Sequence, residues 1–142
     1  MSLSLTESIH IDAPVSKVWQ AITDPSLVQQ YFFGSRTESN FQKGSPIVWR
    51  GEWQGKSYED KGLILESVEN QMLKHSYWSS LSGTPDVPES YMHVTYKLDR
   101  LDEKSTLLSV TQEGLRDETQ VHHSRANWRH VLEALKAVVE RV

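Results

Sequence analysis

Residues 118–142 constrain the fold of this chain more than any other stretch, because they carry one long amphipathic helical pattern. Asp117 stands where an N-cap belongs, and Gln120 completes a pattern that resembles a capping box. At about 100° per residue, the apolar side chains share one stripe. They are Trp128, Val131, Leu132, Leu135, Val138, Val139 and Val142. Such a helix is roughly 37 Å long at about 1.5 Å per residue, so it needs a long partner surface.

Toward the start of this helix the stripe becomes polar. Gln120, Val121 and Ser124 occupy it there, with Arg125 at its margin. Small polar side chains do not fill an interior as Leu does. We therefore expect the second half of the helix to be core and the first half to cover a cavity. The alternative is a helix end that frays into solvent.

The chain before this helix begins with one strand and two short helices. Residues 3–11 alternate apolar and polar side chains and predict a strand. A helix then starts at Pro14, where the missing N–H costs nothing. Asp24-Pro25-Ser26 ends it and starts a shorter helix that runs through Tyr31. The first helix has an apolar stripe of Val15, Val18, Trp19 and Ile22.

From Ser35 to Gly114 the pattern has a period of two, which predicts sequential strands. They cover residues 35–41, 47–53, 58–68, 72–78, 91–101 and 105–113. Apolar side chains take both parities in residues 58–68, so the facing of that strand stays ambiguous. In residues 72–78 and 91–101 one parity is apolar or aromatic, and we expect it to face inward.

This order of elements predicts the fold class. Sequential strands joined by short connections make an antiparallel meander, and strands grouped between helices are typical of α+β proteins. Ten-residue strands at about 3.3 Å per residue match the length of the last helix. We expect one domain over residues 1–142, in which a curved antiparallel sheet of about six to seven strands wraps around the C-terminal helix.

Composition excludes several classes of function. A net charge of −4 argues against a nucleic-acid partner. The absence of Cys excludes disulfides and thiolate metal sites and suits the cytoplasm. No apolar run approaches about 20 residues, so we expect neither a membrane span nor a signal peptide.

Histidines and short motifs give no metal or cofactor site. His122 and His123 are adjacent and point to different sides of the helix, whereas His123 and His130 share its polar face. The chain has no H-E-x-x-H, G-x-S-x-G, G-x-G-x-x-G or P-loop pattern. We therefore expect solvated histidines, no metal and no cofactor.

Two residues are candidates for acid–base chemistry. The strand parity of His75 places it between Leu73 and Tyr77 on the inner face, where it can orient a ligand or act as a base. Glu66, near Ile64, is the candidate carboxylate that would accompany it. The alternatives are a core histidine that a neighbour such as Tyr96 or Gln112 satisfies, and an exposed strand carboxylate.

The aromatic residues are the strongest functional signal. Buried tyrosines need a hydrogen-bond partner or a ligand, and this chain uses Tyr where a solid core would use Phe. The relevant set is Tyr31, Phe32, Trp49, Tyr77, Tyr96 and Trp128. It predicts a cavity lined by rings, and the alternative is a filled aromatic core. The loop at residues 80–88 is a candidate lid.

The outer face of the sheet predicts a weak contact between copies of the chain. By the same parity, apolar side chains lie on that face, namely Trp78, Tyr91, Leu107 and either Leu63 or Leu65. An exposed apolar patch of this kind suggests a weak homodimer.

A set of short motifs spans nearly the whole chain. They are Ala13-Pro14-Val15 through Trp19, Tyr31-Phe32, Trp49, Tyr58 to Gly62, Ile64-Leu65-Glu66, Val94 to Leu98, Thr106 through Gln112, and Asn127-Trp128 before Leu132 and Leu135. With the order of elements, they resemble the helix-grip fold of the START-like, birch-pollen-allergen-like (SRPBCC) superfamily. The closer resemblance is to its branch of homologues of the activator of heat-shock chaperone ATPase. That branch commonly has Gly where this chain has Asn127.

The resemblance implies a cavity for a lipid-like, polyketide-like or aromatic molecule and does not specify catalysis. We expect a non-enzymatic or weakly enzymatic binder. The expected ligand-binding residues are Tyr31, Phe32, Trp49, Ile64, His75, Tyr77, Met92, Val94, Tyr96, Val121, Ser124 and Trp128. One alternative is a cyclase- or hydratase-type enzyme that uses His75 and Glu66. Another is a stress-related module that contacts chaperones. The co-chaperones that give the branch its name carry a further chaperone-contacting domain, so we do not expect chaperone activation from 142 residues.

Overall fold

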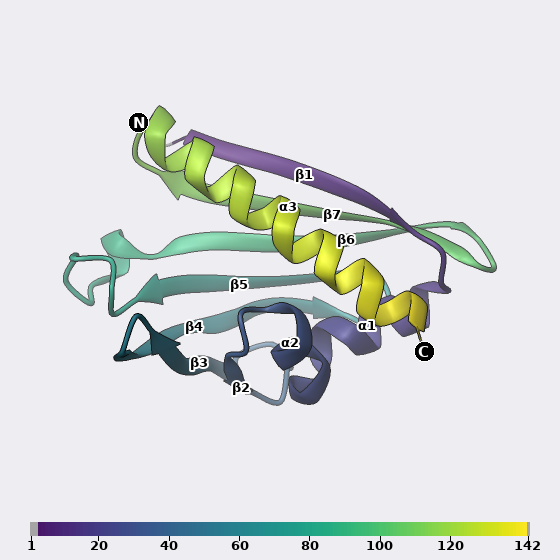
Figure 1. The fold of residues 1–142 in the computed structure, drawn as a ribbon, viewed down its shortest axis with the longest axis horizontal. Helices are drawn as coiled ribbons and strands as arrows, with labels where there is room; N and C mark the ends of the chain where they lie inside the picture. Colours follow the sequence, from purple (N-terminus) through teal and green to yellow (C-terminus); the bar gives the residue numbers. More distant parts are fainter. Residues whose placement is uncertain (1–2, 142) are drawn as a thin grey trace.

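The computed structural model describes residues 3–141, and for Trp53 the backbone alone. Seven strands, three α-helices and one short 3-10 helix follow one another along these residues (Figure 1). Their order is β1 (Leu3–Ile11), α1 (Val15–Thr23), α2 (Pro25–Tyr31), β2 (Arg36–Glu38), β3 (Pro46–Trp53), β4 (Lys56–Val68), β5 (Met72–Ser79), η1 (Pro88–Ser90), β6 (Met92–Asp102), β7 (Ser105–Leu115) and α3 (Glu118–Arg141).

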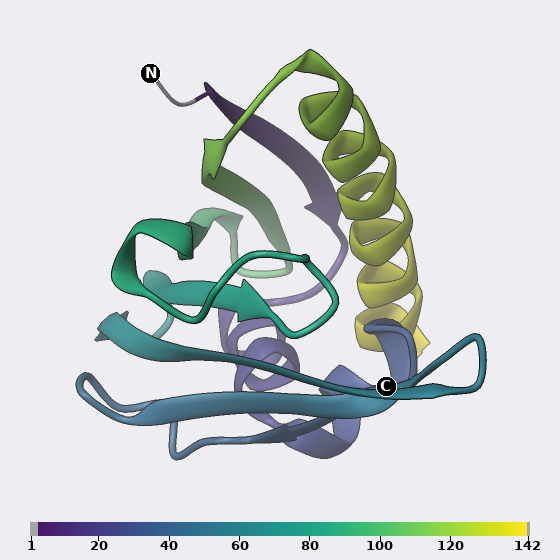
Figure 2. The ribbon, with the colours of Figure 1, turned by 90° about the vertical axis from the view of Figure 1, so that its left-hand side faces the viewer.

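All seven strands form one antiparallel sheet in the order β1-β7-β6-β5-β4-β3-β2. The first strand returns to pair with the last, and the others form a meander. Figure 2 shows the sheet strongly curved, with α3 along its open side. The predicted α+β helix-grip fold is confirmed. The strand expected over residues 35–41 is shorter than predicted, because only Arg36–Glu38 pairs with β3.

Side chains cap the starts of α3, as the sequence predicts, and of α2. The N–H of Gln120 donates to Asp117 Oδ1 at 2.8 Å, and Gln120 Oε1 accepts from the N–H of Arg116 at 2.6 Å. Asp24 accepts from the N–H of Ser26 at 2.9 Å at the start of α2. Val142, which the sequence placed on the stripe of α3, lies outside the described residues.

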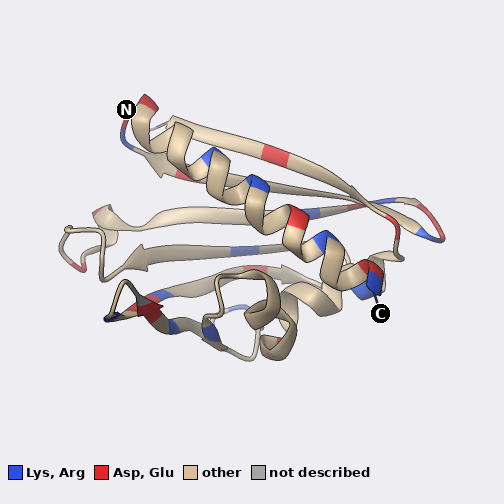
Figure 3. Ribbon diagram, in the orientation of Figure 1, with Lys and Arg blue, Asp and Glu red and all other residues tan. Residues whose placement is uncertain are grey.

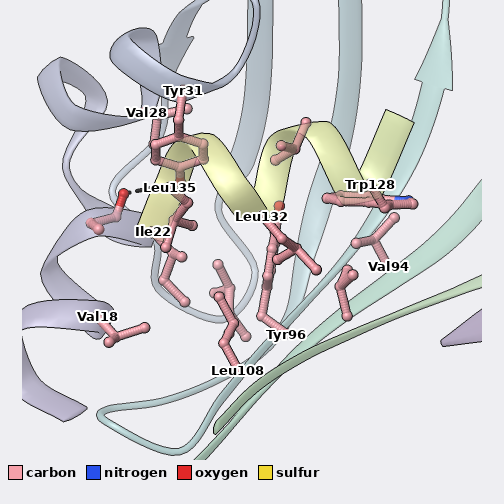
Figure 4. Packing of buried hydrophobic residues seen from close by; sticks show 14 of the residues in the cluster. Val18, Ile22, Val28, Tyr31, Val94, Tyr96, Leu108, Trp128, Leu132 and Leu135 are labelled. Atoms are coloured by element: carbon pink, nitrogen blue, oxygen red, sulfur yellow. Dashed lines mark hydrogen bonds between the residues drawn. The ribbon is translucent and has the colours of Figure 1, made fainter. Parts of the chain in front are cut away.

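The second half of α3 is core, as predicted. Its buried side chains are Trp128, Val131, Leu132, Leu135, Val138 and Val139. Figure 4 shows Leu132 and Leu135 packed among residues of α1, α2 and the sheet, including Ile22, Val28 and Tyr96. None of the helices within residues 3–141 is long and apolar enough to cross a membrane.

An irregularity in β4 explains why its facing was ambiguous. Ile64 pairs with His75, but Glu66 pairs with Lys74, so one extra residue, Leu65, is inserted in β4 between the two pairs. A bulge of this kind reverses the alternation that follows it. Ile64 is therefore buried, whereas Glu66 points to the outer face of the sheet with Lys74.

Polar contacts attach α3 to β1. Glu7 of β1 accepts from Arg125 at 2.6 Å and from Arg129 at 2.7 Å. Farther along, Lys136 Nζ donates to the carbonyl of His10 at 2.8 Å, next to the N–H of Asp12, which donates to Glu140 at 2.7 Å. Figure 3 shows charges of both signs along the side of α3 that faces away from the sheet.

Candidate functional site

A cavity of about 450 Å³ lies between the inner face of the sheet, the end of α2 and the first half of α3. Nine of the residues expected to bind a ligand line it. They are Phe32, Trp49, His75, Tyr77, Met92, Val94, Tyr96, Ser124 and Trp128. Ser124 and Trp128 come from the roof, and six of the others come from strands β3, β5 and β6. The structure thus brings most of the predicted residues together around one space.

Three predicted lining residues lie elsewhere. Tyr31 is a core residue that joins α2 to α1, because its hydroxyl donates to the carbonyl of Ala21 at 3.0 Å (Figure 4); burial raises the pKa of Tyr31 well above its usual value. Ile64 is fully buried beside His75 and does not reach the cavity. Val121 lies in the first turn of α3 and packs half-buried against the edge of the core.

Glu66 does not point inward, and the alternative of an exposed strand carboxylate is correct. Its carboxylate lies on the outer face, half exposed, and accepts from Lys43 Nζ at 3.1 Å. The bulge at Leu65 is the physical reason, since it turns Glu66 away from His75. The two candidate acid–base residues therefore do not share a cavity.

The cavity has lining residues that the sequence did not single out as ligand contacts. They are Phe33, Tyr58, Asp60, Ser79, Leu81, Gln112, Asn127 and Val131. The sequence could have predicted Asn127 and Val131, because they follow Ser124 and Trp128 by three residues and so lie on the same face of α3. For Asp60 the sequence holds one indication that it faces inward, because it has the same strand parity as Ile64 on β4. Its place in the cavity depends on strand register, which pairs it with Trp49 and Ser79.

Aromatic rings form the walls. Trp49 contacts His75 and Tyr77, with ring centroids 5.0 and 5.5 Å apart. On the side of α3, the ring of Trp128 lies 5.9 Å from Tyr96 and 6.1 Å from Phe32, both edge to face. Such arrangements are favourable between rings and present flat apolar surface to a ligand.

His75 is held as a neutral imidazole. Its Nδ1 lies 2.8 Å from the carbonyl oxygen of Ser76 and therefore carries the proton, which leaves Nε2 as an acceptor. Burial lowers the pKa of His75 to about 4, against a weaker opposing effect of the Ser76 carbonyl. The group that satisfies His75 is thus the backbone carbonyl of the next residue, Ser76. Neither Tyr96 nor Gln112, the partners expected from the sequence, does so.

Gln112, beside Trp128, is a second polar group of the cavity. The indole N–H of Trp128 donates to Gln112 Oε1 at 2.8 Å, and Gln112 Nε2 lies 3.2 Å from Met92 Sδ. This amide is therefore engaged at both ends and fixes the ring of Trp128. By contrast, Tyr96 has no hydrogen-bond partner for its hydroxyl among the described residues, and burial raises its pKa. Its phenol is available to a ligand.

Asp60 and Tyr77 form the third polar group of the cavity. The Tyr77 hydroxyl donates to Asp60 Oδ2 at 2.7 Å. Burial, then the negative charge of Asp60, raise the pKa of Tyr77, so the phenol keeps its proton. Asp60 is itself only 8% exposed. Within residues 3–141, no three His, Asp or Glu side chains gather as a metal site would require.

Of residues 80–88, the loop proposed as a lid, only Leu81 lines the cavity, next to Ser79 at the end of β5. Leu81 is 47% exposed, as expected at a mouth. The middle of the loop is fastened to the sheet, because Asp86 accepts from Lys61 at 2.5 Å and from the Tyr91 hydroxyl at 2.6 Å.

The outer apolar residues do not form one patch. Trp78 stacks on Tyr91 at 6.4 Å, and Lys61 covers its ring at 5.7 Å from the centroid. Leu107 pairs with Asp99, far along β6 from the Tyr77–Met92 pair beside Trp78.

Comparisons with known proteins agree with this architecture. The model of the protein family described as Activator of Hsp90 ATPase homolog 1-like protein matches residues 12–140. The chain is also similar to a protein of Cytophaga hutchinsonii, known from its solution structure. The two are 41% identical over 98% of this chain and 94% of that one, with a TM-score of 0.84. No curated protein matches the chain significantly.

More distant structures share the fold alone. DynU16, from the dynemicin biosynthetic locus, is 21% identical with a TM-score of 0.79, and the match covers 96% of this chain and 47% of that one. The Aha1 dimer from Colwellia psychrerythraea is 17% identical with a TM-score of 0.76, and the match covers 97% and 96%.

Proposed function

We propose that this chain binds a small apolar or aromatic molecule. The premise is that the chain belongs to the family of Activator of Hsp90 ATPase homolog 1-like proteins, a branch of the START-like SRPBCC superfamily. The observation that carries the proposal is the cavity of about 450 Å³, lined by rings from both the sheet and α3. This volume lies in the range of small-molecule sites, roughly 300–1,000 Å³. Such sites are typically apolar with a few placed polar groups, and this one has His75, Tyr96 and Asp60.

Apolar burial supplies the affinity in this proposal. A ligand that loses about 200 Å² of apolar surface gains about 5 kcal/mol at about 25 cal/mol per Å², before the cost of association. The polar groups then decide which ligand fits, because each one left unpaired against a ligand costs affinity.

Binding accounts for the geometry better than the cyclase- or hydratase-type alternative does. That alternative required Glu66 and His75 in one cavity, and the bulge in β4 separates them. The chaperone-contacting alternative has no site among the described residues that favours it.

A side chain that fills the cavity is expected to weaken ligand binding without loss of core contacts. Ser124→Phe places a ring in the cavity from α3, whereas Ala126→Phe adds the same ring to the exposed side of the helix. A screen of aromatic and lipid-like molecules by native mass spectrometry and Trp fluorescence supplies the ligand. We expect Ser124→Phe to weaken its binding at least about tenfold through steric exclusion, and Ala126→Phe to leave it unchanged. If the screen finds no ligand, or both variants bind as the wild type does, the proposal is wrong.

The weak homodimer expected from the sequence stays a proposal. It is supported by the stacked pair Trp78–Tyr91 on the outer face and by the exposed side chain of Leu63. Sedimentation equilibrium at high protein concentration tests it. A dimer that dissociates on Trp78→Ser supports the interface, and a monomer at every concentration rules it out.

A further inference from the structure

One carboxylate oxygen in the cavity has no partner. Asp60 lies on β4, paired across the sheet with Trp49 on one side and Ser79 on the other, so its side chain is part of the cavity wall. It is more than nine-tenths buried. Oδ2 accepts the hydroxyl of Tyr77, whereas Oδ1 is buried and has no hydrogen-bond partner. A buried polar atom without a partner is costly and calls for an explanation.

In the described part of the chain, two buried side-chain atoms lack a partner, and the second is Thr37 Oγ1. It lines a separate void of only about 20 Å³ behind Trp49. Among the described residues, Asp60 Oδ1 is therefore the buried unpartnered atom that belongs to the wall of the large cavity, to which Tyr96 also contributes a free hydroxyl.

The charge of Asp60 is also uncompensated. The cations on neighbouring positions of β3 and β4 pair with other carboxylates. Arg50 bonds Glu38 and Glu59, and Lys61 bonds Asp86. Among residues 3–141, none forms an ion pair with Asp60. Buried charges in proteins are normally paired, because an isolated one is expensive.

We infer that Asp60 is the recognition point for a protonated amine, so that the ligand is an aromatic or apolar molecule with an ammonium group. This deepens the proposed function and rests on it. The charge of an ammonium group beside Asp60 neutralises the carboxylate, and a rotation of the Asp60 side chain brings the buried Oδ1 to the ammonium N–H. The rings of Trp49 and Tyr77, whose centroids are 5.5 Å apart beside Asp60, also attract a cation.

A neutral hydroxyl would satisfy only half of this site. It can donate to Oδ1, but it leaves the buried charge without a counterion. An anionic ligand would be repelled. Among ligands of the same shape, we therefore expect the affinity to depend on the terminal group. It is highest for an ammonium, lower for a hydroxyl and lowest for a carboxylate.

Matched probes test this ranking on the wild-type protein. Tryptamine and tryptophol share an indole and a two-carbon arm and differ in ending with an ammonium or a hydroxyl; indolepropionate ends in a carboxylate. Phenethylamine and phenethyl alcohol repeat the first comparison with a smaller ring. We expect titration calorimetry at neutral pH to show each amine binding at least about tenfold more tightly than its alcohol, and indolepropionate most weakly.

The variant Asp60→Asn keeps the size of the side chain and removes its charge. It is expected to lose the preference for the amines while still binding tryptophol. Asp99→Asn, on the other side of the sheet, is the control and should keep the preference. The wild-type ranking decides the question even if Asp60→Asn does not fold. Equal affinities, or tighter binding of the alcohols, overturn the inference and leave the proposed function standing. If none of the probes binds, the inference falls, and the broader screen of aromatic and lipid-like molecules decides the proposed function.

Discussion

Replacing Gly62 with Ala is expected to lower the free energy of unfolding by about 3 kcal/mol or more. At this position β4 and β5 approach so closely that a Cβ would lie 1.8 Å from the carbonyl oxygen of Ser76. That contact is with backbone, so no side-chain rotation relieves it. The neighbouring contacts depend on the same approach, because the N–H of Leu63 donates to Ser76 Oγ at 2.9 Å and the Ser76 carbonyl meets His75. An added methyl group therefore separates the strands that form the floor of the cavity.

Urea denaturation followed by tryptophan fluorescence measures this effect. Gly83→Ala is the matched control, since its Cβ meets nothing within 4 Å although its φ is +77°. Only the cost of a left-handed backbone applies there, about 1–2 kcal/mol. Equal losses in the two variants would contradict the close approach at Gly62.

Acid is expected to destabilise the protein through His75. The unfolded chain binds a proton at this residue below pH 6.5, whereas burial lowers the pKa in the native protein to about 4. Between these values the unfolded state binds more protons, so the free energy of unfolding falls as pH falls. The loss from this residue reaches about 3 kcal/mol at pH 4 and is absent above pH 6.5.

The comparison of His75→Asn with the wild type isolates this contribution. The Asn amide can still donate to the Ser76 carbonyl but does not titrate. Denaturation at pH 7 and at pH 4.5 should therefore show a smaller loss in the variant, with other groups cancelling between the two proteins. His123→Asn, on the exposed side of α3, should behave as the wild type does. A loss at pH 4.5 that is unchanged in His75→Asn would mean that other groups cause it.

Local alternation was enough to predict much of the site. Tyr77, Val94 and Tyr96 were placed inward because their strands keep one parity from end to end, and the structure confirms this. On α3 the helical period likewise placed Ser124 and Trp128 over the cavity. In both cases the relevant geometry belongs to a single uninterrupted element.

Other residues depended on contacts that one element does not encode. The bulge at Leu65 shows in the sequence only as apolar side chains of both parities, which does not locate it, so the facing of Glu66 stayed open. The hydroxyl of Tyr31 is satisfied by the neighbouring helix, and this follows from how α1 and α2 pack. Asp60 joins the cavity through register with Trp49 and Ser79, although a carboxylate on a strand ordinarily faces solvent.

The attachment of α3 to the first strand has a consequence for association. Strand β1 ends the sheet, so one side of its backbone faces no strand. Lys136 donates a hydrogen bond to the carbonyl of His10 there, and Glu140 accepts one from the N–H of Asp12, just after the strand. Backbone groups already engaged by charged side chains are poor templates for a strand from another molecule. By engaging these groups, the helix that roofs the cavity also disfavours the addition of a strand from another molecule at this end of β1.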